Sequence, residues 1–359
     1  MALTGYFSFF MGHISDVWGV RRSLSLGCIL YALGLGLRVF PDSATVAICS
    51  GILAGAGAST ALSALRLLML DLSADDTRVH LVGVKSATNA LGTALGCSLA
   101  GVLPLLISEK SASVDGMRVL LAAAAGGLLI LAVIVGIFAP RNQIHGHDHI
   151  TRQKIKLPWS GFTKIFREHL SLAASTSAIG VMTGLYVSFI TPYLPLIMKE
   201  RGLDLLSIGL STASFALIRF LIDPFIAQII AKNPHHEFRI YVQAEVLIAI
   251  LTGVFLLSIS KWAFVLLLLL RSASLGFSVI SEEAIWLRVF PKEMLGLFFG
   301  LNQSSFFVGD FFGGLLSSFL YKSYGLDICI WIVLFVMVMN LAMFYWLVGR
   351  RPVCVASVA

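Results

Sequence analysis

The sequence predicts an all-α membrane protein, and three observations carry that prediction. Hydrophobic residues make up 58% of the 359 residues, charged residues only 13%, and the mean hydropathy is +0.90. Soluble domains carry about 25% charged residues, so water is not the main solvent of this chain. The apolar residues form about ten stretches long enough to cross a bilayer, which takes about 20 residues of helix. Backbone groups in lipid must be satisfied within their own segment, and this requirement favours helices.

The apolar stretches divide the chain into two parts. Residues 1–138 form the first part, with a fragment at 1–11 and full segments at 24–40, 45–68, 83–107 and 117–138. Residues 139–171 contain Pro140, Pro158 and many charged side chains, a composition that predicts a linker between two helical bundles. Residues 172–348 form the second part, with segments at 172–198, 206–231, 239–259, 262–281, 295–320 and 328–348, and residues 349–359 form a tail.

The basic residues predict an orientation. Lys and Arg are concentrated in alternate connections, on the same side as the central linker. Cytoplasmic loops of membrane proteins carry an excess of these residues, so we expect the linker and the C-terminal tail in the cytoplasm. This topology accounts for the net charge of +7 without a nucleic-acid partner. We expect a monomeric, multi-pass protein of the plasma (cell inner) membrane, with the lipid bilayer as its surroundings.

The sequence offers little for a cofactor or for enzymatic catalysis. It contains no G-x-x-x-x-G-K-[ST] motif for nucleotide phosphates, and neither HExxH nor GxSxG. The five cysteines include no CxxC pair, so neither a zinc site nor a disulfide framework is predicted. His145, His147 and His149 alternate in the linker, and without a second cluster of ligands a solvated loop explains them best. We therefore expect no cofactor, no metal site and no enzyme.

Residues 12–22 carry the motif that narrows the class of protein. They read GHISDVWGVRR and lie between two apolar segments. This pattern resembles G-x-L-a-D-r-x-G-r-k, the cytoplasmic loop signature between the second and third helices of the major facilitator superfamily. Val20 stands where the family usually has a basic residue, and Arg21 follows one position later. The resemblance implies secondary transport and a conformational latch, in which an aspartate faces a helix N-terminus of the opposite half. The latch residues would be Gly12, Asp16, Gly19, Arg21 and Asp71.

An internal repeat supports the same family. Residues 83–101 (GVKSATNALGTALGCSLAG) and 296–314 (GLFFGLNQSSFFVGDFFGG) align without a gap, and the alignment pairs Gly96 with Gly309 and Asn89 with Asn302. The repeat implies two pseudo-symmetric helical bundles, which in this family are related by an axis along the membrane normal. The same spacing places the start of the first bundle before Met1. We therefore expect about 11 of the family's 12 helices, with the first helix and part of the second absent. Either translation starts further upstream or the gene product is truncated.

Four charged side chains are predicted inside apolar segments of the second part. Arg219 and Asp223 lie four residues apart on one helix face, whereas Arg271 and Asp310 lie in the middle of two later segments. A charge inside a membrane costs about 2.5–3.5 kcal/mol on insertion scales, so it indicates function unless a partner neutralises it. The four charges either form a static polar lock or take up and release a proton. We favour Asp310 as the proton carrier, because its partner would lie on another helix.

Other polar residues are assigned to the same cavity or to helix ends. Asn89 and Asn302 are placed with the four charges in the coupling and substrate cavity. Three further acids lie about one turn from the predicted cytoplasmic boundary, where solvation by water explains them; they are Glu245, Glu282 and Glu283.

Glycines recur along the two repeated segments, and we expect them to let helices pack closely. They are Gly92, Gly96 and Gly101 in the first segment, and Gly309, Gly313 and Gly314 in the second. The first run resembles gxxxGPxxGG, the fifth-helix signature of proton-coupled drug exporters, with Cys97 and Ala100 at two of its positions. The resemblance implies an antiporter for efflux of a small organic solute, a drug or metabolite, by alternating access. The alternatives are a proton-coupled uptake symporter, a truncated membrane protein that does not transport, and an intramembrane enzyme.

Overall fold

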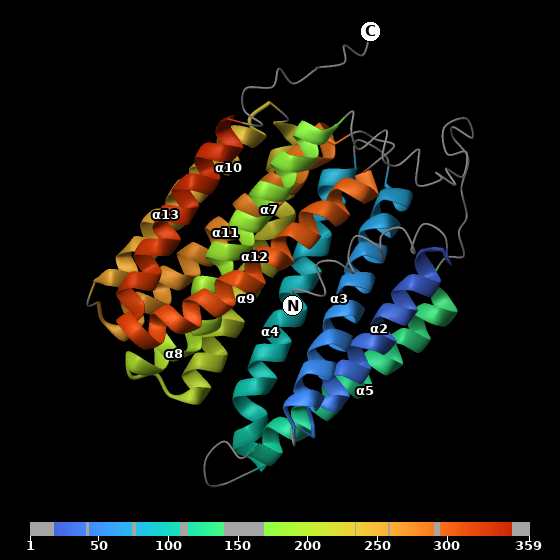
Figure 1. The fold of residues 1–359 in the computed structure, drawn as a ribbon, viewed down its shortest axis with the longest axis vertical. Coiled ribbons are helices and arrows are strands. Elements are labelled where there is room, and N and C mark those ends of the chain that lie inside the picture. The colour runs from blue at the N-terminus through green and yellow to red at the C-terminus, as the bar shows by residue number, and fades with distance from the viewer. Residues whose placement is uncertain are drawn as a thin grey trace. The chain divides into compact units, whose positions relative to one another are not determined.

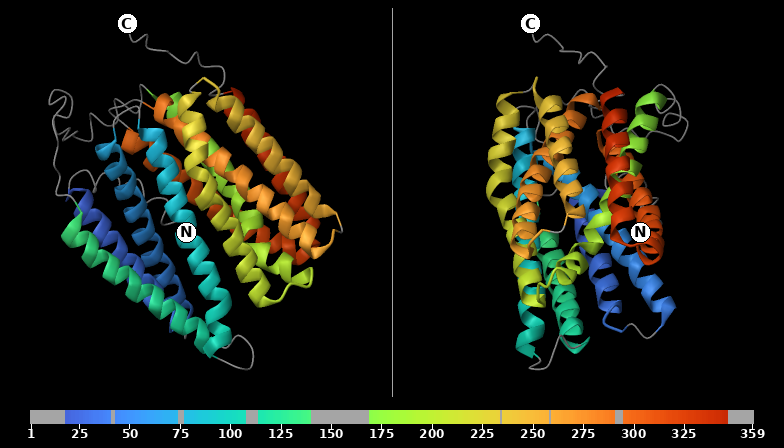
Figure 2. Two further views of the ribbon diagram at one scale, coloured as in Figure 1. Left: turned by 180° about the vertical axis from the view of Figure 1, so that it is seen from behind. Right: turned by 90° about the vertical axis from the view of Figure 1, so that its left-hand side faces the viewer.

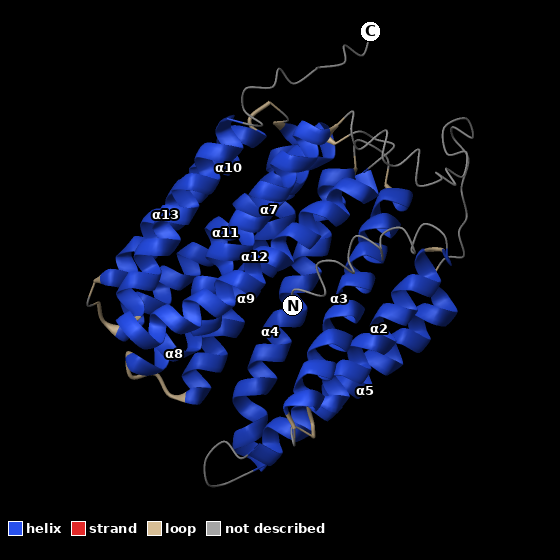
Figure 3. Ribbon diagram, in the orientation of Figure 1, coloured by secondary structure: helices blue, strands red, loops and turns tan. Residues whose placement is uncertain are grey.

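A computed structural model describes residues 18–40, 43–73, 77–107, 114–139, 169–233, 235–257, 259–290 and 295–346. These residues form helices and short connections, with no strand among them (Figure 3). The all-α fold class predicted from the sequence is confirmed. Gly12 and Asp16 of the predicted latch lie outside the described residues, as do the fragment 1–11, nearly all of the linker 139–171 and the tail 349–359.

The long helices of the described residues follow the predicted segments in order (Figure 1). They are α2 (Val20–Leu37), α3 (Ala44–Leu72), α4 (Arg78–Ile107), α5 (Val114–Phe138), α7 (Leu170–Ile190), α9 (Leu205–Lys232), α10 (Glu237–Gly253), α11 (Lys261–Val289), α12 (Leu295–Tyr324) and α13 (Leu326–Phe344). A short helix α8 (Leu194–Glu200) and two 3₁₀ turns, η1 (Thr191–Tyr193) and η2 (Val254–Leu256), lie between them.

The predicted segment 172–198 is broken near its end. α7 stops at Ile190, and η1 and α8 complete the crossing. Pro192 and Pro195 explain the break, because proline has no N–H to donate to the preceding turn of a helix.

Eight of the described helical segments are long and apolar enough to cross a membrane. α4 and α12 are not among the eight, although each has 30 residues, which is about 45 Å at 1.5 Å per residue. Polar residues such as Asn302 and Asp310 lower the hydropathy of α12. In α5 few residues of the apolar span 118–138 are buried, and Ile130 and Val133 are 64% and 60% exposed. An apolar exposed surface of this kind fits lipid.

The chain divides into two compact units, each made of segments that are far apart in the sequence. The first unit contains residues 1–72, 121–184 and 290–311, and the second contains 73–120, 185–289 and 312–359. The units interleave along the chain because α5, α7 and α12 each contribute one end to each unit. The division of the chain into one helical bundle at 1–138 and another at 172–348 stays a prediction.

Close backbone contacts define the helix packing of the first unit. In the α2–α3 pair, a Cβ placed on Gly34 would lie 2.3 Å from the Ala54 nitrogen. In the α7–α12 pair, a Cβ placed on Gly309 would meet the Val181 carbonyl, and one on Gly180 would lie 2.8 Å from the Asn302 carbonyl oxygen. Only glycine fits at such contacts, so these helices approach more closely than larger residues allow.

The second unit contains the functional residues described below. α4 runs beside α9 over most of its length (Figures 1 and 2), with Gly83 against Ala227 near one end of the contact and Gly101 against Gly209 near the other. α10 lies between α11 and α13, and buried side chains of α7, α10, α11 and α13 form one apolar core. Members of this core include Tyr186, Ile248, Leu268 and Met337, each at most 5% exposed.

Candidate functional site

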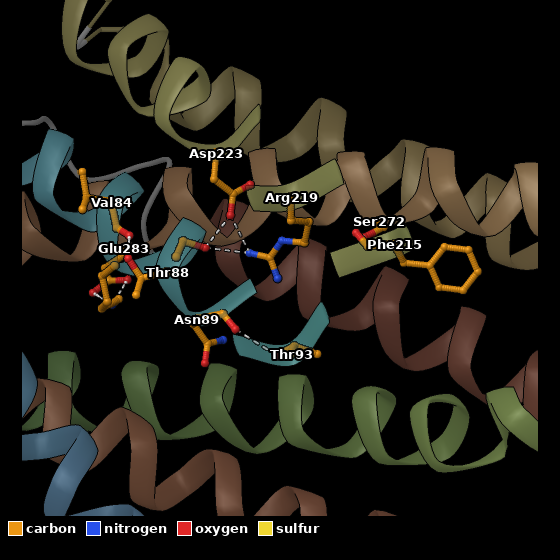
Figure 4. Close-up of polar contacts among 11 residues, drawn as sticks. Val84, Thr88, Asn89, Thr93, Phe215, Arg219, Asp223, Ser272 and Glu283 are labelled. Atoms are coloured by element: carbon orange, nitrogen blue, oxygen red, sulfur yellow. Dashed lines mark hydrogen bonds and ion pairs between the residues drawn. The ribbon is translucent and has the colours of Figure 1, made fainter. Parts of the chain in front are cut away.

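A buried polar triad joins α4 to α9. The Arg219 Nη2 atom lies 3.1 Å from Asp223 Oδ2, as the four-residue spacing predicts. Ser86 of α4 completes the triad: its hydroxyl donates to Asp223 Oδ2 at 2.6 Å and accepts from Arg219 Nη2 at 2.8 Å (Figure 4). Asp223 is 0% exposed, whereas the Arg219 side chain is 21% exposed. The triad therefore neutralises a buried carboxylate with groups from two helices that are distant in the sequence.

The second carboxylate oxygen of Asp223 is placed differently. Asp223 Oδ1 is buried and has no hydrogen-bond partner among the described residues. It lies against Gly276 of α11, where an added Cβ would be 2.4 Å away. The glycine makes room for the carboxylate, and the free oxygen is a position where a proton could bind without displacing Ser86 or Arg219.

A second polar contact joins α4 to α11. Lys85, the neighbour of Ser86, places its Nζ 2.6 Å from Glu283 Oε2. The two side chains are 20% and 14% exposed. The sequence placed Glu283 at a solvated helix end, and the structure corrects this: the carboxylate is largely covered and paired with a lysine 198 residues away. α4 is therefore held at this end by polar contacts to both α9 and α11.

Polar contacts also form a ladder between α10 and α11. Arg271 Nε donates to Thr252 Oγ1 at 3.1 Å, the Ser278 hydroxyl donates to Glu245 Oε1, and Arg288 Nη2 lies 3.1 Å from Glu237 Oε1. Glu245 was expected at a solvated end, and this is wrong: it is 3% exposed. The physical reason is that α10 begins at Glu237, so Glu245 lies about two turns inside the helix.

Comparison with known proteins identifies the family. The family model described as Major Facilitator Superfamily matches residues 1–282. The chain belongs to the Major Facilitator Superfamily. The family resemblance stated from the sequence is thereby confirmed, and the chain is a multi-pass membrane transporter.

A solved structure shares the fold of this transporter. The crystal structure of the human organic anion transporter MFSD10 (TETRAN) superposes with a TM-score of 0.71 at 17% sequence identity, covering 95% of this chain and 81% of that chain. At this identity the likeness concerns the fold alone. A search of the curated proteins found no match.

The predicted family latch is described only in part. Gly19 precedes α2 with φ at +86°, a conformation that glycine adopts without strain. Arg21 Nη2 donates to the Gly136 carbonyl of α5. Asp71 lies in the last turn of α3, and its side chain is outside the described part of the structure. The contact of Arg21 thus ties α2 to α5, and the predicted latch stays a prediction.

The remaining predicted cavity residues lie apart from the triad contacts. Arg271 forms no ion pair with a described acid, and its Nε donates a hydrogen bond to the Thr252 hydroxyl. Asp310 lies in the first unit, is half-buried, and makes no hydrogen bond or ion pair with another described residue. The predicted partner of Asp310 is therefore not seen among the described residues, and of the two predicted aspartates it is Asp223 that contacts another helix, through Ser86. Asn302 is half-buried in the first unit, and Asn89 is exposed on α4.

The predicted packing glycines divide into two groups. Gly101, Gly309 and Gly313 lie at close helix contacts. At Gly92, Gly96 and Gly314 an added Cβ would meet no atom within 4 Å, so the packing prediction needs correction there. Gly83 and Gly101 are 18 residues apart, about five full turns, and share the face toward α9. Gly92 is nine residues from Gly83, about two and a half turns, and so lies on the opposite face.

Proposed function

We propose that this transporter exports a small organic solute by alternating access in exchange for protons, and that Asp223 carries the exchanged proton. The observation that supports this most directly is the Ser86–Arg219–Asp223 triad. It places a fully buried carboxylate at a contact between two helices that the family repeat assigns to different halves. A carboxylate at such a contact changes its partners whenever the two helices part.

The proposed coupling follows from the charges of the triad. With Asp223 ionised, the carboxylate attracts both the Arg219 guanidinium and the Ser86 hydroxyl, and α4 stays against α9. A proton that binds to Asp223 removes the negative charge and so weakens both contacts. Hydrogen bonds to charged groups contribute about 1.5–3 kcal/mol each, and the one from Ser86 crosses from α4 to α9, so its weakening shifts the balance toward separated helices. Proton uptake and helix separation are thereby linked.

The proposed solute contact is a stripe of polar and small residues on α4. Asn89, Gly92, Thr93 and Gly96 are exposed, and Figure 4 shows Asn89 and Thr93 on the turns next to Arg219. The glycines leave space beside the helix, and the Asn89 amide offers a donor and an acceptor for an organic solute. The stripe follows the triad along α4, so bound solute and the proton site would act on the same helix.

A reconstituted system tests the proposal. Purified protein is placed in liposomes with fluorescein as an anionic probe, since the solved structure with the same fold is named an organic anion transporter, and with ethidium as a cationic probe. An acidic outside buffer drives protons inward. Exchange predicts that one of the probes leaves the liposomes, and Asp223→Asn abolishes this flux, while Asp327→Asn at an exposed acid of α13 does not.

The other outcomes separate the alternatives. Accumulation of the probe inside the liposomes supports an uptake symporter. Absence of proton-driven flux for both probes contradicts the proposal and favours a membrane protein that does not transport. The alternative carrier is tested by Asp310→Asn: loss of flux in this variant with full flux in Asp223→Asn assigns the proton to Asp310.

A further inference from the structure

A second buried carboxyl group lies away from the α4–α9 contact. Glu245 of α10 is 3% exposed. Its Oε1 accepts from the Ser278 hydroxyl, and its Oε2 is buried with no hydrogen-bond partner among the described residues. No Lys, Arg or His in the described part of the chain forms an ion pair with it. An ionised carboxylate in such a place has lost its water without gaining a counter-ion, which is strongly unfavourable.

The nearest cation of the same ladder is held away from Glu245. Arg271 is 7% exposed, and its Nε donates to Thr252 at 3.1 Å. Glu245 and Thr252 are seven residues apart on α10, as are Arg271 and Ser278 on α11. Seven residues correspond to about 10.5 Å along a helix axis. The guanidinium therefore interacts with the acid at long range, without direct contact.

The other titratable groups around Glu245 are acids and phenols. Tyr186 of α7 and Tyr241 of α10 lie within electrostatic reach of Glu245, and both also lie within reach of Glu282 of α11. Glu282 is itself engaged, since its Oε1 accepts from Trp286 Nε1 at 3.1 Å. None of these neighbours supplies a positive charge, so Arg271 is the cation that can compensate Glu245.

We infer that Glu245 is a second proton-binding site of the transporter, enclosed by α7, α10 and α11, and that it holds a proton in the conformation described here. This inference rests on the proposed proton exchange and adds a site to it. The neutral acid avoids an uncompensated charge in the core, and the Ser278 hydroxyl satisfies one of its oxygens. Release of the proton requires that Arg271 leaves Thr252 and turns along the ladder toward Glu245. Thr252 is thus a positioning residue that selects the protonated state.

The protonation state can be measured directly. In infrared spectra of the reconstituted protein at neutral pH, we expect the carbonyl band of a protonated carboxylic acid, shifted in D₂O, to decrease in Glu245→Gln. Glu282→Gln serves as the matched control and retains the band. Glutamine has the shape of the neutral acid and preserves the Ser278 contact. A band of equal intensity in wild type and Glu245→Gln overturns the inference.

Transport gives a second readout. The Glu245→Gln variant is tested for exchange of fluorescein or ethidium across the liposome membrane with a proton gradient. The proton-driven rate of this variant is expected to fall at least tenfold and to lose its dependence on pH. An unchanged pH profile in this variant overturns the inference while leaving the role of Asp223 intact. Absence of proton-driven flux in the wild type instead contradicts the proposed function.

Thr252 provides a test that does not alter the carboxyl group. Thr252→Val removes the acceptor for Arg271, so the guanidinium is free to pair with Glu245 and to favour its ionised form. We expect the infrared band to weaken and the pH profile of transport to move toward acid. Thr252→Ser retains the hydroxyl and is expected to behave as wild type. Equal behaviour of the valine and serine variants contradicts the positioning role.

Discussion

Ser86→Ala tests how strongly the triad holds α4 against α9. The Ser86 hydroxyl makes two contacts with charged groups, at 2.6 Å to Asp223 Oδ2 and 2.8 Å to Arg219 Nη2. Both contacts cross from α4 to α9, whereas the Arg219–Asp223 contact at 3.1 Å lies within α9 and survives the substitution. Because the hydroxyl bridges a single ion pair, we count its loss as about one charge-assisted hydrogen bond, or about 1.5–3 kcal/mol. At about 1.4 kcal/mol per factor of ten, the ratio of joined to separated helices falls by roughly 10- to 150-fold.

Distance measurements between spin labels detect this change. Labels at Val84 of α4 and Phe225 of α9, which are 42% and 65% exposed, flank the triad. In a variant without the native cysteines, Ser86→Ala is expected to reduce the population with a short distance between the two labels and to increase the population with a longer distance. Thr88→Ala is the control, because Thr88 is exposed and its hydroxyl donates only to the Val84 carbonyl of its own helix at 2.8 Å. Equal distance distributions in Ser86→Ala and wild type, or an equal shift in both variants, would refute the reasoning.

Two glycine substitutions test the local geometry. Gly276→Ala places a Cβ 2.4 Å from Asp223 Oδ1, so we expect about 1–3 kcal/mol of destabilisation by overpacking and reduced proton-driven flux; Gly253→Ala, whose nearest neighbour is 3.7 Å away, should leave thermal unfolding and flux nearly unchanged. Gly19→Ala forces a side chain into φ of +86°, which costs about 1–2 kcal/mol. Thermal unfolding in detergent should occur at lower temperature in this variant, and a midpoint no lower than that of Gly36→Ala, a helical site with open space, would contradict the strain.

Local spacing in the sequence predicted what depends on a single helix. The apolar segments gave the helices and their order, because the length of a membrane span depends only on consecutive residues. The Arg219–Asp223 pair follows from a spacing of four, since such residues share a helix face. The break after α7 was not predicted, although Pro192 and Pro195, which cannot donate to the helix ladder, account for it. The motif at residues 12–22 pointed to the family.

The sequence pattern did not predict which residues of distant segments contact one another. Ser86 contacts Asp223 across 137 residues and Lys85 contacts Glu283 across 198, and no periodicity along one helix specifies which turns of two helices meet. Glu245 was misjudged because hydropathy alone does not locate a helix start. The packing of distant helices encloses Glu245 and brings Lys85 next to Glu283.

The glycines show the division between the two kinds of information. The sequence by itself determined that α4 is rich in small residues and carries the repeated pattern. Only the tertiary structure decided that Gly83 and Gly101 meet α9 while Gly92 and Gly96 face away from it. A helix presents every residue at a fixed angle, but the face that a neighbour covers depends on how several helices pack together. The residues left uncovered on α4 include Asn89 and Thr93, which form part of the proposed solute stripe.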